Sequence, residues 1–209
     1  MNNDIIENTV HETGYWYSSF TSIVQAHLNF PDLARWLVAF LLQHKEQIIY
    51  DFGCGNAYYL QKLHDNDFKN LIGIEPECPV KNTPFQILPH NLAFDLPLTK
   101  KGIVISLEVG EHIPQKYQDT FIDNITKLCD SYLILSWAIV GQIGIGHVNC
   151  KNNDEVIKLF EEKDFTYQKN LTEDIRNCSF GEINYFKHTL LIFKKNESLL
   201  TKNFFNKQK

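Results

Sequence analysis

The stretch that decides the fold is Ile48-Ile-Tyr-Asp-Phe-Gly-Cys-Gly-Asn-Ala57. Its first half is a short apolar and aromatic run, which predicts a buried strand. The run leads directly into Gly53 and Gly55, where a backbone without Cβ atoms can turn sharply and approach a ligand closely. A helical pattern follows over residues 56–64. The stretch therefore predicts a strand, a tight glycine loop and a helix, as found at the ligand edge of an open α/β sheet.

Similar strand-like and helix-like patterns alternate on both sides of this stretch. The expected strands are 47–52, 70–74, 85–88, 102–107, 132–137 and 186–193, and the expected helices are 31–44, 56–64, 115–129 and 154–162. Asp154 is the expected N-cap of the last helix. Strands that alternate with helices indicate a parallel sheet covered on both faces. We therefore expect one α/β domain.

Length and composition fit this expectation. The chain has 209 residues, of which 44% are hydrophobic, and this is enough to bury the core of one domain. Its five cysteines form no C-x-x-C pair, which argues against a disulfide framework and favours a reducing, cytoplasmic location. No apolar run approaches the roughly 18–20 residues that span a bilayer, and the polar first residues do not resemble a signal peptide.

The charge of the chain indicates which classes of partner it can bind. The formal net charge is −5, and Arg35 and Arg176 are the only arginines. Nucleic-acid binding depends on clustered positive charge, so a nucleic-acid partner is disfavoured and a small-molecule acceptor is expected. No membrane contact is expected, and the sequence leaves the oligomeric state open.

An acidic residue accompanies the glycine loop. Glu75 follows Gly55 by twenty residues, at the end of the next expected strand, where a carboxylate can accept both hydroxyls of a ribose. The dinucleotide pattern G-x-G-x-x-G fails because its third glycine would fall on Tyr58. Asp51, two residues before the first glycine, suits a cationic ligand better than a diphosphate. The alternative is a tight turn that binds no ligand.

These residues carry a family resemblance. Asp51–Ala57, followed by Gly73-Ile-Glu75, resembles motifs I and II of the class I S-adenosylmethionine-dependent methyltransferases. The resemblance continues through 106–114 and 146–149 and spans about residues 45–195. It implies a Rossmann-like, seven-stranded, mostly parallel sheet flanked by helices in a single domain, with S-adenosylmethionine as the cofactor.

The same resemblance implies roles for individual residues. The implied cofactor-binding set is Asp51, Gly53 and Gly55 at the methionine end, Glu75 at the ribose, Asn91 at the adenine, and Glu108. The chain departs from the pattern at Ala57, where a third glycine is usual. Residues 76–83 are also too short and too interrupted by proline for the usual helix after the second strand.

A cluster of titratable residues, Glu108, Glu111 and His112, follows the fourth expected strand and should face the crevice. Three interpretations remain open: a site for Mg²⁺ or Mn²⁺, a general base at Glu111 or His112, or capping of the helix that Pro114 opens. A Glu-x-x-Glu-His pattern is also seen in metal-assisted O-methyltransferases of quinone biosynthesis and in small-RNA terminal 2′-O-methyltransferases. In the latter a later histidine joins the site, and His147 is the candidate here.

The sequence thus predicts three segments and a function. The segments are a helical and aromatic cap over 1–44, a methyltransferase domain over 45–195 and a polar tail over 196–209. The glycine-rich loop 136–147 is expected to rim the acceptor site. The predicted function is methyl transfer to a hydroxyl of a small molecule, with a sugar as one candidate. The alternatives are a metal-assisted RNA ribose 2′-O-methyltransferase and a non-catalytic cofactor-binding subunit.

Overall fold

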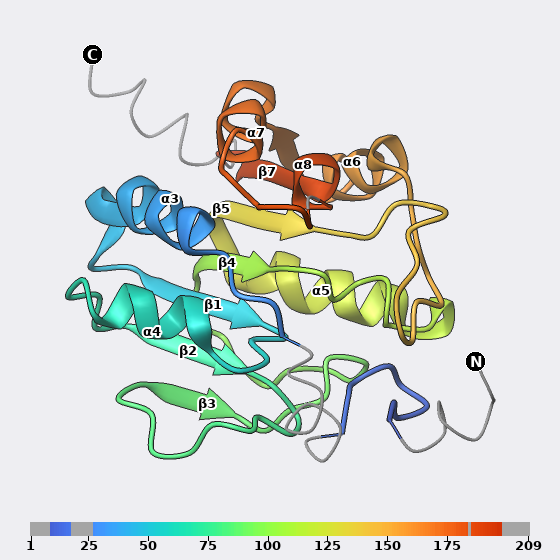
Figure 1. Ribbon diagram of the computed structural model, residues 1–209, viewed down its shortest axis with the longest axis horizontal. Coiled ribbons are helices and arrows are strands. Elements are labelled where there is room, and N and C mark those ends of the chain that lie inside the picture. The colour runs from blue at the N-terminus through green and yellow to red at the C-terminus, as the bar shows by residue number, and fades with distance from the viewer. Residues whose placement is uncertain (1–8, 18–26, 184, 198–209) are drawn as a thin grey trace.

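The strands form a single mixed sheet in the computed structural model, which describes residues 9–17, 27–183 and 185–197 (Figure 1). The strands are β1 (Ile48–Phe52), β2 (Leu71–Ile74), β3 (Gln86–Leu88), β4 (Gly102–Ser106), β5 (Cys129–Ser136), β6 (Phe165–Tyr167) and β7 (Leu190–Lys195). Their order across the sheet is β3-β2-β1-β4-β5-β7-β6, and only β7 runs antiparallel to its neighbours. The predicted seven-stranded, mostly parallel sheet is confirmed.

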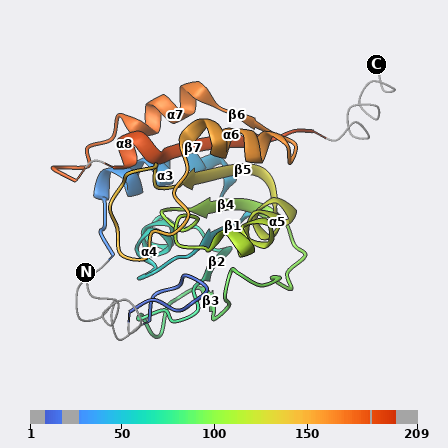
Figure 2. The same ribbon diagram turned by 90° about the vertical axis from the view of Figure 1, so that its right-hand side faces the viewer.

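Helices cover both faces of the sheet (Figure 2). They are α3 (Pro31–Leu41), α4 (Tyr58–His64), α5 (Gln118–Leu128), α6 (Asn153–Glu161), α7 (Lys169–Arg176) and α8 (Phe186–Thr189), with 3-10 turns at η1 (Leu42–His44) and η2 (Gln115–Tyr117). Successive residues of a strand pack in the cores on opposite faces of the sheet, because side chains alternate along a strand. In β1, Ile49 packs in the cluster that includes α3 and α4, whereas Tyr50 packs in the cluster with α5 and α6. Both residues are almost fully buried.

The order of the strands indicates which edge of the sheet binds ligands. The chain leaves the central strand β1 towards β2 on one side and later returns to β4 on the other, so β1 and β4 flank a topological switch point. Ligands of open α/β sheets bind outside the carboxyl ends of the strands at such a point. Segment 9–17 and the loop after β5 both lie at this edge (Figure 1).

Several boundaries differ from the expectations. Phe186–Thr189 is a helical turn and not the start of the last strand, because the Phe186 ring packs against Phe30 and Phe180. The N-cap of α6 is Asn152 and not Asp154, since the Asn152 amide and Glu155 form a capping box with a 3.0 Å hydrogen bond.

Two elements were not expected from the sequence. Strand β6 has only three residues, and α7 carries little more than Leu171 and Ile175 as an apolar stripe. Both are held by the antiparallel strand β7: β6 pairs with it directly, and the Thr172 hydroxyl of α7 accepts a hydrogen bond from the Ile192 amide.

The expected cap and tail are only partly covered by the described residues. Residues 1–8 and 18–26 of the cap, and 198–209 of the tail, lie outside them. The helical part of the cap, α3, packs its Leu33, Leu37 and Leu41 into the core beside α4. No helix among the described residues is long and apolar enough to cross a membrane.

Candidate active site

The glycine loop after β1 has the backbone that the sequence requires. Gly53 and Gly55 have positive φ angles of 74° and 51°. A Cβ atom on Gly53 would lie 2.5 Å from the Val109 side chain, and one on Gly55 would lie 2.6 Å from the His27 ring. Ala57, at the position where a third glycine is usual, also has a positive φ of 57°. The chain therefore keeps the left-handed geometry of a third glycine with an alanine.

The loop's backbone amides already have partners within the chain. Those of Gly53 and Cys54 donate to the Ile74 carbonyl, at 2.8 and 3.3 Å, and that of Gly55 donates to Glu75 Oε2 at 3.0 Å. The amides of Ala57 and Tyr58 bond to Cys54 O and Asn56 Oδ1. Apart from the Asn56 amide, the loop thus has no free donors for a phosphate, in keeping with its departure from the dinucleotide pattern.

Two carboxyl groups, those of Asp51 and Glu75, border this loop. Asp51 is buried in β1, and Glu75 follows β2 and reaches back to the Gly55 amide. Burial, reinforced by Glu75, raises the pKa of Asp51 to about 7, and burial also raises the pKa of Glu75 to about 7. A cation placed beside them would favour the ionised form of both.

One continuous cavity of about 370 Å³ joins this loop to the residues after β4. Its lining includes Asp51, Gly53, Gly55, Glu75, Asn91, Glu108, His112 and His147, all of them predicted from the sequence. No lysine or arginine is found among the described residues that line it. The described part of the lining is therefore acidic, and histidine is the only residue type in it that can become positive.

Asn91 lines the cavity with its side chain already engaged. Its amide nitrogen donates to the Thr13 hydroxyl at 2.7 Å, and its oxygen accepts the Ala93 amide at 3.0 Å. The oxygen has a second lone pair, so its assignment to the adenine stays a prediction.

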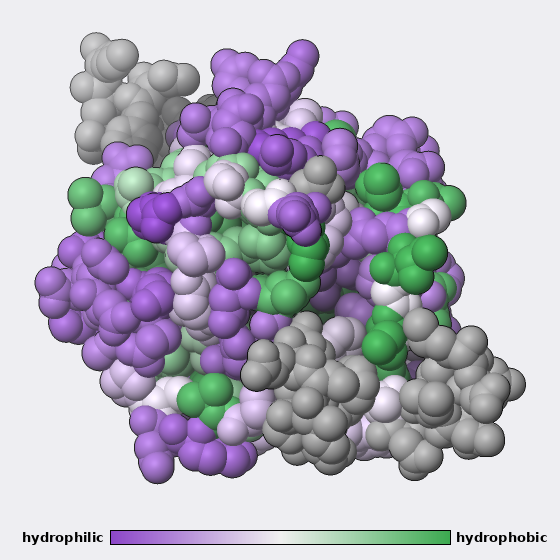
Figure 3. All heavy atoms as spheres, in the orientation of Figure 1, coloured by the Kyte–Doolittle hydropathy of each residue, from purple (hydrophilic) through white to green (hydrophobic). Residues whose placement is uncertain are grey.

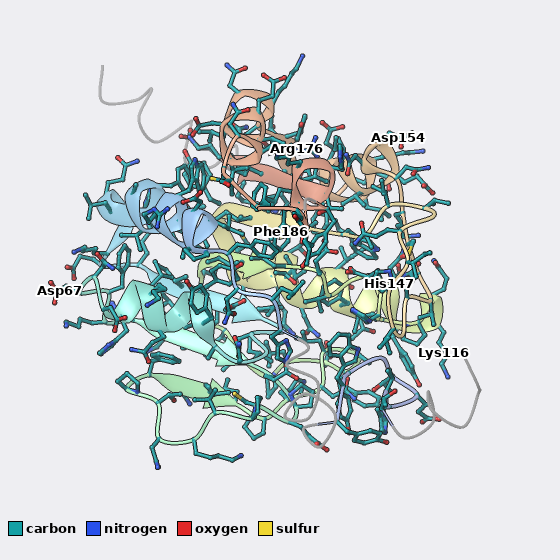
Figure 4. All side chains as sticks on the ribbon, viewed as in Figure 1. Asp67, Lys116, His147, Asp154, Arg176 and Phe186 are labelled. Carbon is teal, nitrogen blue, oxygen red and sulfur yellow. The ribbon has the colours of Figure 1, made fainter. Side chains whose placement is uncertain are left out.

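Glu111, His112 and His147 converge beside the cavity. One ligand atom from each lies within 4.8 Å of the others, and Glu111 Oε1 is 4.0 Å from His147 Nε2. His147 comes from the loop after β5, at the same edge of the sheet as the end of β4 (Figure 4). Glu108 does not belong to this group: its Oε2 accepts a 2.7 Å hydrogen bond from Gln142.

The side chain of Glu111 is fully buried, and neither of its oxygens has a hydrogen-bond partner among the described residues. Burial, reinforced by Glu108, raises its pKa well above the usual value. An unpartnered buried carboxyl group is costly, which indicates that a ligand completes the site.

The two imidazoles are oriented by backbone carbonyls. Nδ1 of His112 lies 3.2 Å from Gly146 O, and Nδ1 of His147 lies 3.0 Å from Gln142 O. A carbonyl can only accept, so each Nδ1 carries a proton. Burial is the main cause that lowers the pKa of His112 to about 3, and the neighbouring His147 is the second cause. His112 is therefore neutral. Metal-binding histidines are commonly oriented in the same way, by a hydrogen bond from the ring nitrogen that does not bind the metal.

The donor set fits a divalent metal: one carboxylate and two imidazole nitrogens, with positions left for water or substrate. The third interpretation of this segment is wrong, because no side chain caps the turn after Pro114. Glu108 has a positive φ of 54°, and its side chain is bonded by Gln142 while it also raises the pKa of Glu111. Its assignment as a metal ligand stays a prediction.

No protein-family model and no curated protein matches the sequence. Solved structures do match. Magnesium protoporphyrin IX methyltransferase from Synechocystis, with bound S-adenosylhomocysteine, is 17% identical with a TM-score of 0.58, over 81% of this chain and 89% of that chain. The sugar N-methyltransferase KedS8 from Streptoalloteichus is 11% identical with a TM-score of 0.63, over 90% and 95%. The methyltransferase domain of bacterial CtHen1 is 15% identical with a TM-score of 0.57, over 79% and 99%.

The chain has the class I S-adenosylmethionine-dependent methyltransferase fold. The resemblance drawn from 51–57 and 73–75 is thereby confirmed at the level of fold. Residues 76–83 form no helix, as predicted from their prolines.

The methyltransferase fold is covered at its functional edge by segment 9–17, which the sequence indicated only through its aromatic residues. Val10 pairs with Trp16, and Gly14 packs so closely on the His112 carbonyl that a Cβ atom would collide with it. Trp16 also packs edge-on against the His112 ring, with 5.3 Å between centroids.

His27 also lines the cavity, and it was not expected there from the sequence. It belongs to no motif and reaches the glycine loop only because the chain before α3 passes over it. Its ring stacks on Trp16, with 5.9 Å between centroids.

Proposed function

We propose that this protein transfers a methyl group from S-adenosylmethionine to a hydroxyl group of a small molecule. The observation that carries the proposal is the single cavity that joins the acidic glycine-loop site to Glu108, His112 and His147. One end suits a cationic nucleoside, and the other end suits activation of an acceptor.

The cofactor assignment rests on charge and on the neighbours. S-adenosylmethionine carries a sulfonium, an ammonium and a ribose, and no phosphate. Asp51 and Glu75 supply carboxylates beside a loop whose amides are already bonded. The Synechocystis enzyme has been solved with S-adenosylmethionine and with S-adenosylhomocysteine.

In the proposed reaction the acceptor oxygen attacks the methyl carbon in line with the sulfonium. The new O–C bond forms as the S–C bond breaks, S-adenosylhomocysteine leaves, and the hydroxyl proton passes to a base or to water. Holding the oxygen close to the carbon can remove on the order of 7–11 kcal/mol of barrier. The protein's main contribution is therefore to position the two substrates.

Glu111, His112 and His147 would hold a divalent metal, Mg²⁺ or Mn²⁺. The support is the unpartnered buried Glu111 carboxyl group and the two imidazoles whose Nδ1 atoms are engaged by carbonyls. When bound, such an ion lowers the pKa of an oxygen ligand and favours its ionised form. This need for an ionised oxygen favours a hydroxyl over an amine acceptor.

The proposed acceptor class is supported by the loop after β5, whose Ile143 lines the cavity. Val140, Ile143 and Val148 are exposed apolar residues on the loop after β5, which lies on the right of the face in Figure 3. Ile143 is 92% exposed and also lines the cavity. An acidic cavity with an apolar rim suits a small neutral acceptor, and the likeness to a sugar N-methyltransferase supports a sugar as one class.

A second candidate is methylation of an RNA ribose 2′-hydroxyl. It is favoured by the convergence of His147 with Glu111 and His112, since a later histidine joins the site in the small-RNA enzymes that the motif resembles. The absence of lysine and arginine from the described lining of the cavity argues against it, because RNA binding needs positive charge.

The test begins with binding. Titration calorimetry should detect both S-adenosylmethionine and S-adenosylhomocysteine, and failure of the wild type to bind either would refute the proposal. Mn²⁺ should raise the thermal midpoint of the wild type and of Glu46→Gln, an exposed control, but not that of Glu111→Gln. An equal shift in all three proteins would remove the metal from the proposal.

Transfer of labelled methyl groups then separates the acceptors. Sugars and other small hydroxyl compounds should accept the label, whereas a short RNA with a free 2′-hydroxyl should not. Labelling of the RNA alone would favour the second candidate. Cofactor binding without transfer to any acceptor would favour the non-catalytic subunit.

A further inference from the structure

Among the described residues that line this cavity, none is an evident partner for the carboxylate of the cofactor. The inference rests on the proposed function, since S-adenosylmethionine and S-adenosylhomocysteine both end in an amino acid with an ammonium and a carboxylate. Asp51, Glu75, Glu77 and Glu108 line the cavity and attract the ammonium but repel the carboxylate. A donor, and above all a positive one, must offset this repulsion.

The backbone does not supply that donor. In many nucleotide sites the amides of a glycine loop bind the anion. Here the amides of Gly53, Cys54 and Gly55 are bonded to Ile74 O and to the Glu75 side chain. A carboxylate would have to displace these bonds to use them. Of the loop amides only that of Asn56 is left over, and it is neutral, so a positive donor must come from a side chain.

Among the described lining residues, the only side chains that can become positive are three histidines. His112 donates its Nδ1 proton to Gly146 O, and His147 donates its own to Gln142 O. Both rings also belong to the cluster with Glu111, in which His147 Nε2 lies 4.0 Å from Glu111 Oε1. That leaves His27.

We propose that His27 binds the carboxylate at the amino-acid end of the cofactor. Its ring lies against Gly55, where a Cβ atom would approach Cε1 and Nδ1 to 2.6 Å. The resemblance places the methionine end of the cofactor at this glycine. Gly55 is therefore required by the histidine as well as by the turn.

The position of His27 is fixed by packing. The ring stacks on Trp16 at an interplanar angle of 26°, and Trp16 is held in turn against His112. A side chain that is already oriented loses little entropy on binding its partner.

The test compares two ligands that differ only in the carboxylate: S-adenosylhomocysteine and its decarboxylated analogue, S-adenosyl-3-thiopropylamine. A charge-assisted hydrogen bond contributes about 10- to 100-fold in affinity. Calorimetry should show the wild type binding S-adenosylhomocysteine at least about tenfold tighter than the analogue. His27→Ala should reduce that ratio to near one while leaving the analogue's affinity unchanged, and His27→Gln should restore part of it.

The matched control is His188→Gln, an exposed histidine outside the cavity, which should keep the wild-type ratio. An unchanged ratio in His27→Ala, or an equal loss for both ligands, would overturn the inference, because the ring would then serve only packing. Equal binding of the two ligands by the wild type would overturn it as well, while leaving the proposed function standing. If the wild type binds neither ligand, the proposed function itself fails.

Discussion

Replacing Asp51 by asparagine should make the ligand-free protein less sensitive to pH. Asp51 is 3% exposed, and burial with the nearby Glu75 raises its pKa from 3.8 to about 7. A raised carboxyl pKa means that the folded state binds more protons than the unfolded state between these two values. Stability must therefore fall as pH rises through this range and level off above about pH 8.

The magnitude follows from the shift. Each pKa unit corresponds to 1.36 kcal/mol, so a shift of about three units costs the wild type roughly 4 kcal/mol above pH 8. Asparagine has the same shape without the charge. It brings amide donors that lack assured partners, at about 1–3 kcal/mol, but this cost does not vary with pH. The informative quantity is thus the difference in unfolding free energy between variant and wild type, which should shift by about 2 kcal/mol in the variant's favour from pH 5 to pH 7.

Urea unfolding at pH 5, 6, 7 and 8 measures this difference directly. Asp95→Asn is a suitable control, because its side chain is 91% exposed, and its difference from the wild type should stay nearly constant. A difference between Asp51→Asn and wild type that does not change with pH would show that burial does not hold the proton on Asp51. The account of the acidic cavity would then be wrong.

Three further predictions concern the same region. S-adenosylmethionine should bind roughly eightfold tighter at pH 7.5 than at pH 6, because ionised Asp51 is needed for the ammonium, and calorimetry should find this trend lost in Asp51→Asn. Ala57→Gly should raise the free energy of unfolding by about 1 kcal/mol by relieving the positive φ, and a drop in urea stability would contradict this. Asn124→Ala should cost about 3 kcal/mol in the same assay, because the buried amide bonds the Leu96 amide and the carbonyls of Leu92 and Phe94; a loss below about 1 kcal/mol would show that water replaces these bonds.

The parts of the fold that were predicted correctly have strong local signals. The glycine loop after Ile48–Phe52 and the apolar runs of the central strands are visible in the sequence alone. The strand β6 and the helix α7 were missed because they are short and draw their stability from pairing with β7 and packing on it. Such tertiary support leaves little trace in local periodicity.

Some residues of the candidate site could likewise be predicted from the sequence, and others could not. Glu111 and His112 follow a strand end and could be placed from spacing, and His147 could be added by resemblance. Glu108 is not in the metal-binding group, and its hydrogen bond from Gln142, 34 residues later in the chain, could not be predicted from spacing. His27 could not be predicted either, because its place in the cavity is set by packing against Trp16 and not by any motif.

The bonded glycine loop also bears on the kinetics of recognition. The hydrogen bonds donated by the amides of Gly53 and Gly55 fix the conformation of the loop before any ligand binds. Binding therefore does not require this loop to rearrange. Association at this end of the cleft should then be governed by diffusion and electrostatic steering towards the acidic mouth, with slowed arrival of a cationic ligand at high ionic strength. The residence time of the bound ligand, in contrast, should depend on its short-range contacts inside the cavity.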